Sequence, residues 1–418
     1  MSELGRNAIT INGRSYDWPD VPAIAICLDG CEPAYLDTAI AAGLMPNLVD
    51  IKQRGTVRFA HSAMPSFTNP NNLSIATGRP PAVHGICGNY LYDPATGEEV
   101  MMNDPRFLRA PTLFKGFFDA GARVAVVTAK DKLRALLGHG LAFPDRAVCF
   151  SAERAGATTL AGNGIDNASA WLDRPVPEVY SAELSEFVFA AGVKLLREFR
   201  PDIMYLTTTD YVQHKFAPGT AQANAFYAMF DHYLGELDAL GAAVVVTADH
   251  GMKPKHKADG TPDVIYLQDL LDTWLGAGAA RVILPITDPY VVHHGALGSF
   301  ATAYLPDSVD RAALIERLRG VAGLDLVLDR QQACARFELP EDRMGDLVLI
   351  SSENKTIGTS AARHDLAALK EPLRSHGGLT EQRVPFIVNR RLPDLPDAPV
   401  LRNFDAFYYA VAATRVAR

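Results

Sequence analysis

The chain has 418 residues, of which 48% are hydrophobic and 21% charged, and its formal net charge is −8. This length exceeds one compact core, so we expect a large α/β domain with a substantial insertion, or two domains. The excess of acidic residues is not typical of nucleic-acid-binding proteins, which normally show a basic stripe. No apolar run reaches the roughly 20 residues that span a bilayer. The polar N-terminus lacks a signal-peptide core, and the five cysteines form no CxxC pair. We therefore expect a cytoplasmic protein with reduced thiols and with no nucleic-acid or membrane partner.

Short apolar runs alternate with helical patterns through the first 255 residues. The expected strands are Ala23–Leu28, Arg123–Thr128, Asp202–Thr207 and Ala243–Thr247. The expected helices are Thr112–Ala120, a helix capped by Ser181 that runs to Phe199, and Thr220–Leu240. The segment Gly138–Pro177, rich in Gly, Ala, Pro and Asn, is expected to be a loop region. The alternation predicts an α/β fold, with a central, mostly parallel sheet and helices on both faces.

The pattern changes after about residue 255. Shorter strands are expected at Arg281–Pro285, Ser299–Tyr304 and Asp346–Ile350, with one helix near Asp310–Gly320 and charged turns between them. This pattern predicts a smaller α+β cap inserted into the core. We expect residues 15–255 and 375–418 to form the catalytic core and residues 256–374 to form the cap.

Acidic residues follow three of the expected strands. Asp29 follows the first, Asp210 follows IMYLTTT, and Asp249-His250 follows AVVVTA. A single Asp after a strand is common in turns, but side chains at the carboxyl ends of parallel strands converge on one crevice. His214 lies four residues after Asp210, on the same face of a helical turn, and His376 lies in a Gly-rich loop. Carboxylate and imidazole ligands suit zinc, with manganese or iron as second choices.

Thr68 lies in the segment PSFTNPNNLSIATG, where a loop is expected to enter a helix. An anion at that position would face unpaired N–H groups and the positive end of the helix dipole. The alternative is that Thr68 only caps the helix.

These motifs occur in an order that resembles the alkaline phosphatase superfamily, most of all its nucleotide pyrophosphatase/phosphodiesterase branch. The resemblance rests on Asp29, residues 65–78, the segment Pro81–Ile86 followed by Asn89, Asp210 with His214, Asp249–Gly251, and His376-Gly377. It implies an alkaline-phosphatase-like fold that binds two zinc ions per chain. Asp210, His214 and His376 would hold one ion, and Asp29, Asp249, His250 and the Thr68 alkoxide would hold the other. Asn89 would bind a phosphoryl oxygen, and His84-Gly85 would be structural.

The activity implied by this resemblance is attack of Thr68 at phosphorus, followed by hydrolysis of a phosphothreonine intermediate. Within the branch, the chain is similar to members that cleave the C–P bond of a small, anionic, carboxylated phosphonate. Lys130 and Lys132 follow the strand that ends at Thr128. Two residues apart in an extended loop, they would face one way, and we expect them to bind the substrate carboxylate. The alternative is a solvated Lys-Asp-Lys turn.

Other functions remain open from the sequence. A phosphodiesterase or nucleotide pyrophosphatase would use the same metals and need an aromatic slot, for which Phe67 and Tyr90 are candidates. A phosphomutase would keep the phosphate for transfer, and a metal-stabilised binding protein would need no nucleophile. In the cap, surface or core roles are favoured over a role in the cleft for His293, His294 and Lys355. The sequence is compatible with a homodimer.

Overall fold

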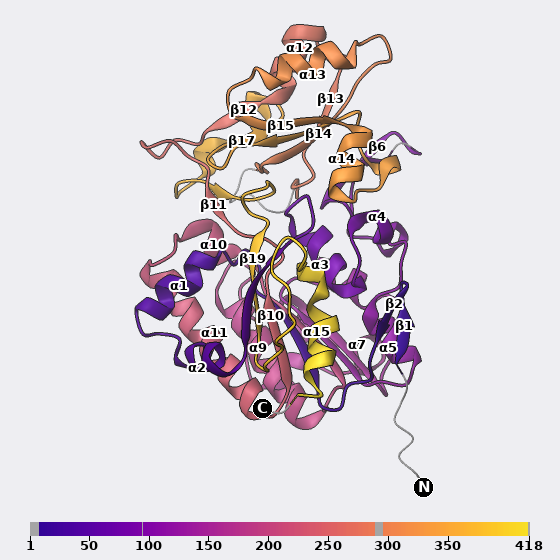
Figure 1. The fold of residues 1–418 in the computed structure, drawn as a ribbon, viewed down its shortest axis with the longest axis vertical. Coiled ribbons are helices and arrows are strands. Elements are labelled where there is room, and N and C mark those ends of the chain that lie inside the picture. Colours follow the sequence, from indigo (N-terminus) through magenta and orange to yellow (C-terminus); the bar gives the residue numbers. More distant parts are fainter. Residues whose placement is uncertain (1–7, 94, 289–295, 417–418) are drawn as a thin grey trace.

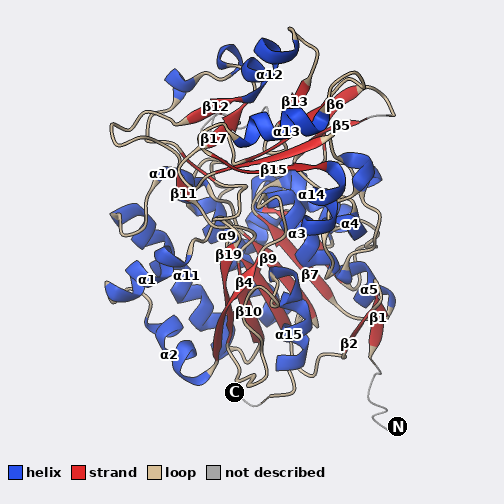
Figure 2. Cartoon of the chain, turned by 45° about the horizontal axis from the view of Figure 1, so that its top comes forward, coloured by secondary structure: helices blue, strands red, loops and turns tan. Residues whose placement is uncertain are grey.

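The computed structural model describes residues 8–93, 95–288 and 296–416. Its centre is a seven-stranded sheet (Figures 1 and 2). The strand order is β4 (Thr56–His61), β19 (Arg383–Val388), β10 (Ala243–Thr247), β3 (Ala23–Cys27), β9 (Ile203–Thr207), β7 (Val124–Thr128) and β8 (Ala147–Ser151). The five strands from β10 to β8 are parallel, whereas β19 and β4 are antiparallel to their neighbours. The predicted α/β fold with a mostly parallel sheet is confirmed.

Helices cover both faces of this sheet, as Figure 1 shows. One face carries α1 (Pro33–Ala41), α2 (Pro46–Arg54), α9 (Glu183–Glu198) and α11 (Ala221–Ala239). The other carries α3 (Thr68–Thr77), α5 (Leu113–Asp119) and α15 (Ala406–Ala413). Because both faces are covered, every residue of the five parallel strands is buried. This burial explains why the strands appear in the sequence as continuous apolar runs.

Two local predictions were wrong. Residues 138–177 are not a loop region, because they contain β8, the 3-10 helix at Ala152–Ala157, α7 (Leu160–Asn163) and α8 (Ala168–Leu172). Ser181 does not cap α9, which begins at Glu183 after Ala182. The Ser181 hydroxyl donates instead to the carbonyl oxygen of Glu178 at 2.8 Å, which stabilises the preceding turn.

A second, antiparallel sheet lies beyond the carboxyl ends of the central strands, at the top of Figure 1. Its order is β13 (Arg281–Ile283), β14 (Phe300–Tyr304), β16 (Leu347–Ser351) and β15 (Leu324–Asp329), with helices α12 (Leu267–Leu275), α13 (Arg311–Arg319) and α14 (Arg330–Phe337) around it. The hairpin β5 (Tyr90–Asp93) and β6 (Glu98–Met101) also packs here, since the rings of Tyr92 and Tyr304 lie 5.0 Å apart. This hairpin comes from the sequence range expected to belong to the core, and the 256–374 boundary of the cap remains a prediction.

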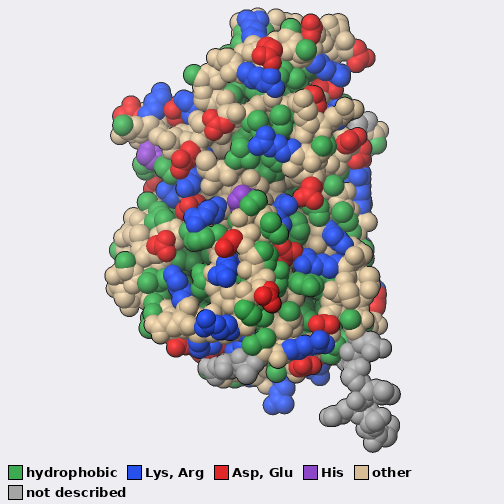
Figure 3. Space-filling view, in the orientation of Figure 1, with side chains coloured by type: hydrophobic (Ala, Val, Ile, Leu, Met, Phe, Trp, Pro, Cys, Tyr) green, Lys and Arg blue, Asp and Glu red, His purple; other side chains and the backbone are tan. Residues whose placement is uncertain are grey.

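Shorter elements complete the described chain. They are β1 (Ile9–Ile11), β2 (Arg14–Tyr16), α4 (Pro81–His84), α6 (Asp131–Leu137), α10 (Tyr211–Lys215), β11 (Lys253–Pro254), β12 (Val264–Tyr266), β17 (Thr356–Gly358) and β18 (Arg374–Ser375). Within the described residues, no helix combines the length and apolarity needed to cross a bilayer. Basic and acidic side chains are interspersed over the face shown in Figure 3.

Candidate metal and phosphoryl-transfer site

Three neighbouring strand ends bring the acidic residues together. Asp29 follows β3, Asp210 lies between β9 and α10, and Asp249 follows β10. Because β3 pairs with both β9 and β10 in parallel, these loops leave the sheet side by side. His214 comes from α10, His250 follows Asp249, and His376 lies just after β18. All six predicted ligands are buried in one cluster.

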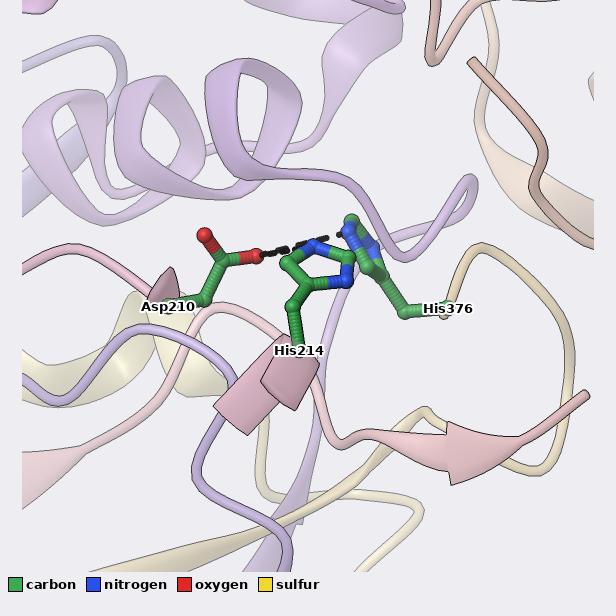
Figure 4. Close-up of side chains that lie close together, drawn as sticks. All are labelled: Asp210, His214 and His376. Atoms are coloured by element: carbon green, nitrogen blue, oxygen red, sulfur yellow. Dashed lines mark ion pairs between the residues drawn. The ribbon is translucent and has the colours of Figure 1, made fainter. Parts of the chain in front are cut away.

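The imidazole and carboxylate atoms form two overlapping groups. Nε2 of His214 lies 2.9 Å from Oδ2 of Asp210, and Nε2 of His376 lies 3.6 Å from the same oxygen (Figure 4). In the second group Nε2 of His250 lies 3.3 Å from Oδ1 of Asp29. Potential ligand atoms of Asp210, His214 and His376, and of Asp29, Asp210 and His250, lie within 4.8 Å of one another in each group.

Asp249 lies at the edge of the second group. Its Oδ2 is 3.7 Å from Nε2 of His250 and accepts a hydrogen bond from Nδ2 of Asn72 at 3.3 Å. Its Oδ1 accepts from the backbone N–H groups of Gly30 and His250 at 3.2 and 3.0 Å. Asp210 is thus shared between the two groups in this structure, and the assignment of Asp249 to the second metal remains a prediction.

The hydrogen bonds of the three histidines test whether the cluster fits a metal. Each ring binds a backbone carbonyl oxygen through Nδ1. The partners are Arg374 for His214, Gly251 for His250 and Ser66 for His376, at 2.7, 2.8 and 2.7 Å. A carbonyl oxygen only accepts, so Nδ1 must carry the proton, and Nε2 of each neutral ring presents a lone pair to the cluster.

The carboxylates point to the same conclusion. Oδ1 of Asp29 is buried, and no hydrogen-bond donor reaches it among the described residues. Its neighbour, Nε2 of His250, presents a lone pair when the ring is neutral, so a proton or a metal ion must lie between these two electron-rich atoms. The residues therefore fit divalent metal ions, and their oxygen and nitrogen donors suit zinc.

The pKa values of the carboxyl groups reflect this crowding. Burial and the charges of Asp210 and Asp249 raise the pKa of Asp29 well above its usual value. Burial raises the pKa of Asp249 to about 7. For Asp210, burial also acts to raise the pKa, but positive charge on the adjacent His214 and His376 rings in their protonated forms outweighs it and lowers the pKa well below its usual value. Without a cation the cluster must therefore retain protons at neutral pH.

Thr68 is the first residue of α3, and Phe67 occupies the capping position before it. The Thr68 side chain makes no capping hydrogen bond, so the interpretation of Thr68 as the helix cap is wrong. Its Oγ1 lies 3.4 Å from Nε2 of His250, which directs the hydroxyl to the metal cluster. Nearby, Oδ1 of Asn89 accepts from the backbone N–H of Asn69 at 3.3 Å. While Oδ1 accepts from Asn69, the Nδ2 group of Asn89 can act as a donor towards the cavity.

One cavity joins these groups to the two lysines. It is lined by Thr68, Asn89, Lys130, Lys132, Asp288, Thr208, Thr209 and Ile286 together with Asp29, Asp210, His214 and His376. Lys130 immediately precedes α6 and Lys132 lies within it, so the extended geometry expected for this pair is wrong. Lys132 forms an ion pair with Asp288. Burial and the charge of Lys132 lower the pKa of Lys130. The pair therefore lines the phosphoryl cavity and does not form a fully solvated turn.

Comparison with known proteins identifies the family. Residues 23–379 match the model of the type I phosphodiesterase / nucleotide pyrophosphatase family. The chain belongs to this family. The predicted branch of the alkaline phosphatase superfamily is thus confirmed, and the chain is a hydrolase.

Family relatives differ in length from this chain. An uncharacterized pyrophosphatase/phosphodiesterase of Schizosaccharomyces pombe is 28% identical in an alignment of 251 residues that covers 55% of this chain and 44% of that protein. Rat ectonucleotide pyrophosphatase/phosphodiesterase family member 1 is 24% identical in an alignment of 250 residues that covers 56% of this chain and 24% of that protein. The chain thus spans less than half the length of these curated relatives.

Solved structures of the family include a much nearer relative. Phosphonoacetate hydrolase from Sinorhizobium meliloti 1021, in complex with phosphonoacetate, is 77% identical with a TM-score of 0.96, over 99% of this chain and all of that chain (100%). Murine ectonucleotide pyrophosphatase / phosphodiesterase 5 is 18% identical with a TM-score of 0.64, over 95% of each chain, and it shares the fold.

Several residues singled out in the sequence lie outside the phosphoryl site of this family member. His84 is buried, its Nδ1 accepts from the backbone N–H of Ile86 at 3.2 Å, and its Nε2 lies 2.9 Å from the Ser74 hydroxyl, which supports a structural role. Lys355 pairs with Asp263 at 2.6 Å within the cap. His293 and His294 lie outside the described residues.

The sequence analysis missed several residues that line the cavity, among them Thr208, Thr209 and Asp288. The hydroxyl of Thr208 accepts from the backbone N–H of Asp29 at 2.9 Å and so fixes the loop that carries this carboxylate. Thr209 lines the cavity beside Asp210. Both follow β9 directly, and their position at the same strand end was the available signal. Asp288 comes from the region of the second sheet, and no local pattern connected it with Lys132.

Proposed function

We propose that this chain hydrolyses the C–P bond of phosphonoacetate to acetate and phosphate, using two zinc ions and Thr68 as the nucleophile. The observation that carries the proposal is the presence of Lys130 and Lys132 in the same cavity as Thr68 and the metal cluster. The similarity to the Sinorhizobium meliloti protein, which is named phosphonoacetate hydrolase, supports the choice of substrate. The cytoplasmic location and the homodimer remain predictions.

The metal-binding residues divide as the family resemblance implies. Asp210, His214 and His376 would hold one zinc ion, and Asp29, Asp249 and His250 would hold the second beside Thr68. Bound there, zinc would lower the pKa of the Thr68 hydroxyl and neutralise charge on the phosphoryl oxygens. The shared position of Asp210 between the two histidine groups is compatible with two closely spaced ions.

The protein groups around Thr68 account for the first half of the reaction. Oγ1 of Thr68 attacks phosphorus, the P–C bond breaks, and phosphothreonine forms. The phosphoryl group would lie at the N-terminus of α3, where the backbone N–H of Thr68 and the helix dipole would stabilise negative charge. Nδ2 of Asn89 would donate to one phosphoryl oxygen, while the Asn89 oxygen accepts from Asn69.

The two lysines address the difficulty of a carbon leaving group. The electron pair of the broken bond passes to the CH2 carbon and is delocalised into the carboxylate as an enediolate, which becomes acetate by taking up a proton equivalent to the one that the Thr68 hydroxyl loses. Lys130 and Lys132 would bind that carboxylate and stabilise its added charge. Water then attacks phosphothreonine, releasing phosphate and restoring the Thr68 hydroxyl.

A phosphodiesterase or nucleotide pyrophosphatase is the second candidate, and the family match favours it. Its expected aromatic slot lacks support from Phe67, which is fully buried and packs edge-on against the His376 ring at 5.5 Å. Tyr90 bonds to Glu99 at 3.2 Å on the β5–β6 hairpin and does not line the cavity. A small substrate that ends in a carboxylate fits the lysine pair better.

Phosphate release from phosphonoacetate, with and without a chelator, tests the proposal directly. Lys130→Ala and Lys132→Ala should reduce this activity far more than the hydrolysis of a p-nitrophenyl phosphate ester, whose leaving group needs no carboxylate binding. Lys115→Ala provides a matched control, because this lysine pairs with Asp119 on the surface of α5. Equal losses on both substrates would contradict the role of the lysines.

The nucleophile is tested separately. Thr68→Ala should abolish turnover while the protein retains most of its zinc, because the remaining ligands are unchanged. Near-wild-type turnover of this variant would refute Thr68. Release of nucleoside monophosphate from a dinucleotide, with no phosphate from phosphonoacetate, would favour the phosphodiesterase instead.

A further inference from the structure

Asp288 is a buried carboxylate in the cavity that contains the two lysines. Its side chain is 3% exposed and forms an ion pair with the ammonium of Lys132. The two residues come from different parts of the fold, since Lys132 lies in α6 and Asp288 follows β13 of the second sheet. The contact thus places a negative charge, from the segment that follows β13, beside Lys132 in this cavity.

The charges that would face the carboxylate of the proposed substrate, its distal end, can be counted. Lys130 and Lys132 contribute two positive charges, and Asp288 offsets one of them. Asp131, between the lysines, is directed elsewhere, since its Oδ1 accepts from Arg134 and from the Ser151 hydroxyl at 2.8 and 2.9 Å. Apart from the metal-cluster carboxylates, Asp288 is the acidic residue lining this cavity among the described residues. One positive charge remains, which matches one carboxylate.

We propose that Asp288 determines substrate specificity by offsetting one of the two lysine charges. The remaining charge favours a substrate whose distal group is a singly charged carboxylate and disfavours one with a second, doubly charged phosphoryl group. This inference rests on the proposed function, because it assumes that the distal end of the substrate faces Lys130 and Lys132. A nucleotide or diphosphate would place its second phosphoryl group against the Asp288 carboxylate. Asp288 also positions Lys132, whose flexible side chain would otherwise have to be ordered by the substrate.

The proposal predicts a change in selectivity that a purely structural role would not produce. Two unit charges a few ångströms apart at a partly buried site interact strongly enough to change binding by more than about tenfold. Removing the Asp288 charge should therefore favour a doubly charged distal group over a singly charged one. A loss of folding alone would weaken both ligands to a similar extent.

The experiment compares two ligands on zinc-loaded protein by calorimetry. Phosphonoformate carries a carboxylate next to the phosphonate, and methylenediphosphonate carries a second phosphonate. Wild type should bind phosphonoformate more tightly. In Asp288→Asn the ratio of the dissociation constants, methylenediphosphonate over phosphonoformate, should fall at least tenfold. Asp288→Ser serves as a second neutral variant if the first is unstable.

Two controls make the outcome specific. Asp288→Glu keeps the charge, and Asp131→Asn removes a charge between the same lysines but outside this cavity. Both variants should keep the wild-type ratio of dissociation constants within about threefold, because neither removes the charge that faces the distal group. An unchanged ratio in Asp288→Asn, or an equal fall in Asp131→Asn, would overturn the inference. Tighter binding of methylenediphosphonate to wild type would overturn it without any variant. Failure of phosphonoacetate turnover in wild type would instead refute the proposed function, because the binding ratio is measured independently of turnover.

Discussion

Replacing Glu381 by Gln should lower the free energy of unfolding by roughly 3–5 kcal/mol, because it leaves a buried ammonium unpaired. Lys255 and Glu381 are both fully buried, and their Nζ and Oε1 atoms lie 3.0 Å apart. Nζ of Lys255 also donates to the carbonyl oxygen of Glu353 at 2.5 Å. A carbonyl cannot neutralise the charge, so the full cost of an uncompensated buried cation applies once the carboxylate is lost.

The same pair supports the loops that carry two metal ligands. Oε2 of Glu381 accepts from the backbone N–H of Gly378 at 2.8 Å, two residues beyond His376. The backbone carbonyl of Glu381 accepts from the N–H of Gly251 at 2.7 Å, next to His250. We therefore expect Glu381→Gln to weaken zinc retention as well as stability, because loss of the carboxylate disturbs the side-chain bond to the loop after His376, whereas the backbone bond to Gly251 is retained.

Denaturant unfolding and zinc content after dialysis measure the two effects. The double variant Lys255→Met/Glu381→Met is the matched control, because it removes both charges and keeps side chains of similar length. It should be more stable than Glu381→Gln, since no unpaired charge remains in the interior. A loss of less than about 1 kcal/mol in the single variant, or a double variant less stable than the single one, would refute the argument.

Three further predictions concern the phosphoryl site and its surroundings. Asn89→Ala should lower kcat/KM by roughly tenfold or more for phosphonoacetate and for a phosphate ester alike, because the lost donor faces the phosphoryl group. Steady-state assays on both substrates measure this effect, and a loss on only one of them would contradict the role of Asn89. Chelation should lower the free energy of unfolding by about 2.7 kcal/mol per site when free zinc had been 100-fold above Kd, as melting with and without chelator would show. Burial lowers the pKa of His84 to about 3. As the pH falls below about 6.5, the unfolded chain therefore binds a proton at this histidine that the folded chain does not bind. The free energy of unfolding of wild type should fall by roughly 2 kcal/mol between pH 7 and pH 5 through this residue, a loss that His84→Gln does not show. Denaturant unfolding that gives the same loss of stability in wild type and His84→Gln between pH 7 and pH 5 would contradict this prediction.

The sequence predicted the metal-bearing strand ends because local signals sufficed there. Continuous apolar runs marked β3, β9 and β10, and the acidic residues stand at their ends. The antiparallel strands β4 and β19 were missed, since their Arg, Thr and Pro residues interrupt the apolar pattern. β8 was missed because its five buried residues lie within a Gly- and Pro-rich segment.

The lysine pair shows a different kind of limit. Asp131 at the helix N-terminus, with Leu133, Leu136 and Leu137 at helical spacing, indicates α6, yet the segment was interpreted as an extended loop. Acidic residues are favoured in the first turn of a helix, so this signal was present in the sequence. The partner of Lys132 was not predictable in the same way, because Asp288 lies 156 positions along the chain.

This contrast separates the origin of the proposed metal site from that of the proposed substrate specificity. The predicted metal ligands arise from sheet topology, since parallel strands β10, β3 and β9 must end at the same edge. The groups at the distal end of the cavity depend instead on how the second sheet approaches α6, as the Lys132–Asp288 pair illustrates. Changes in that approach can alter the charge presented to the leaving group while Asp29, Asp210 and the three histidines remain in place. We therefore expect a substitution at Asp288 to change the preferred distal group of the substrate without altering the predicted metal ligands.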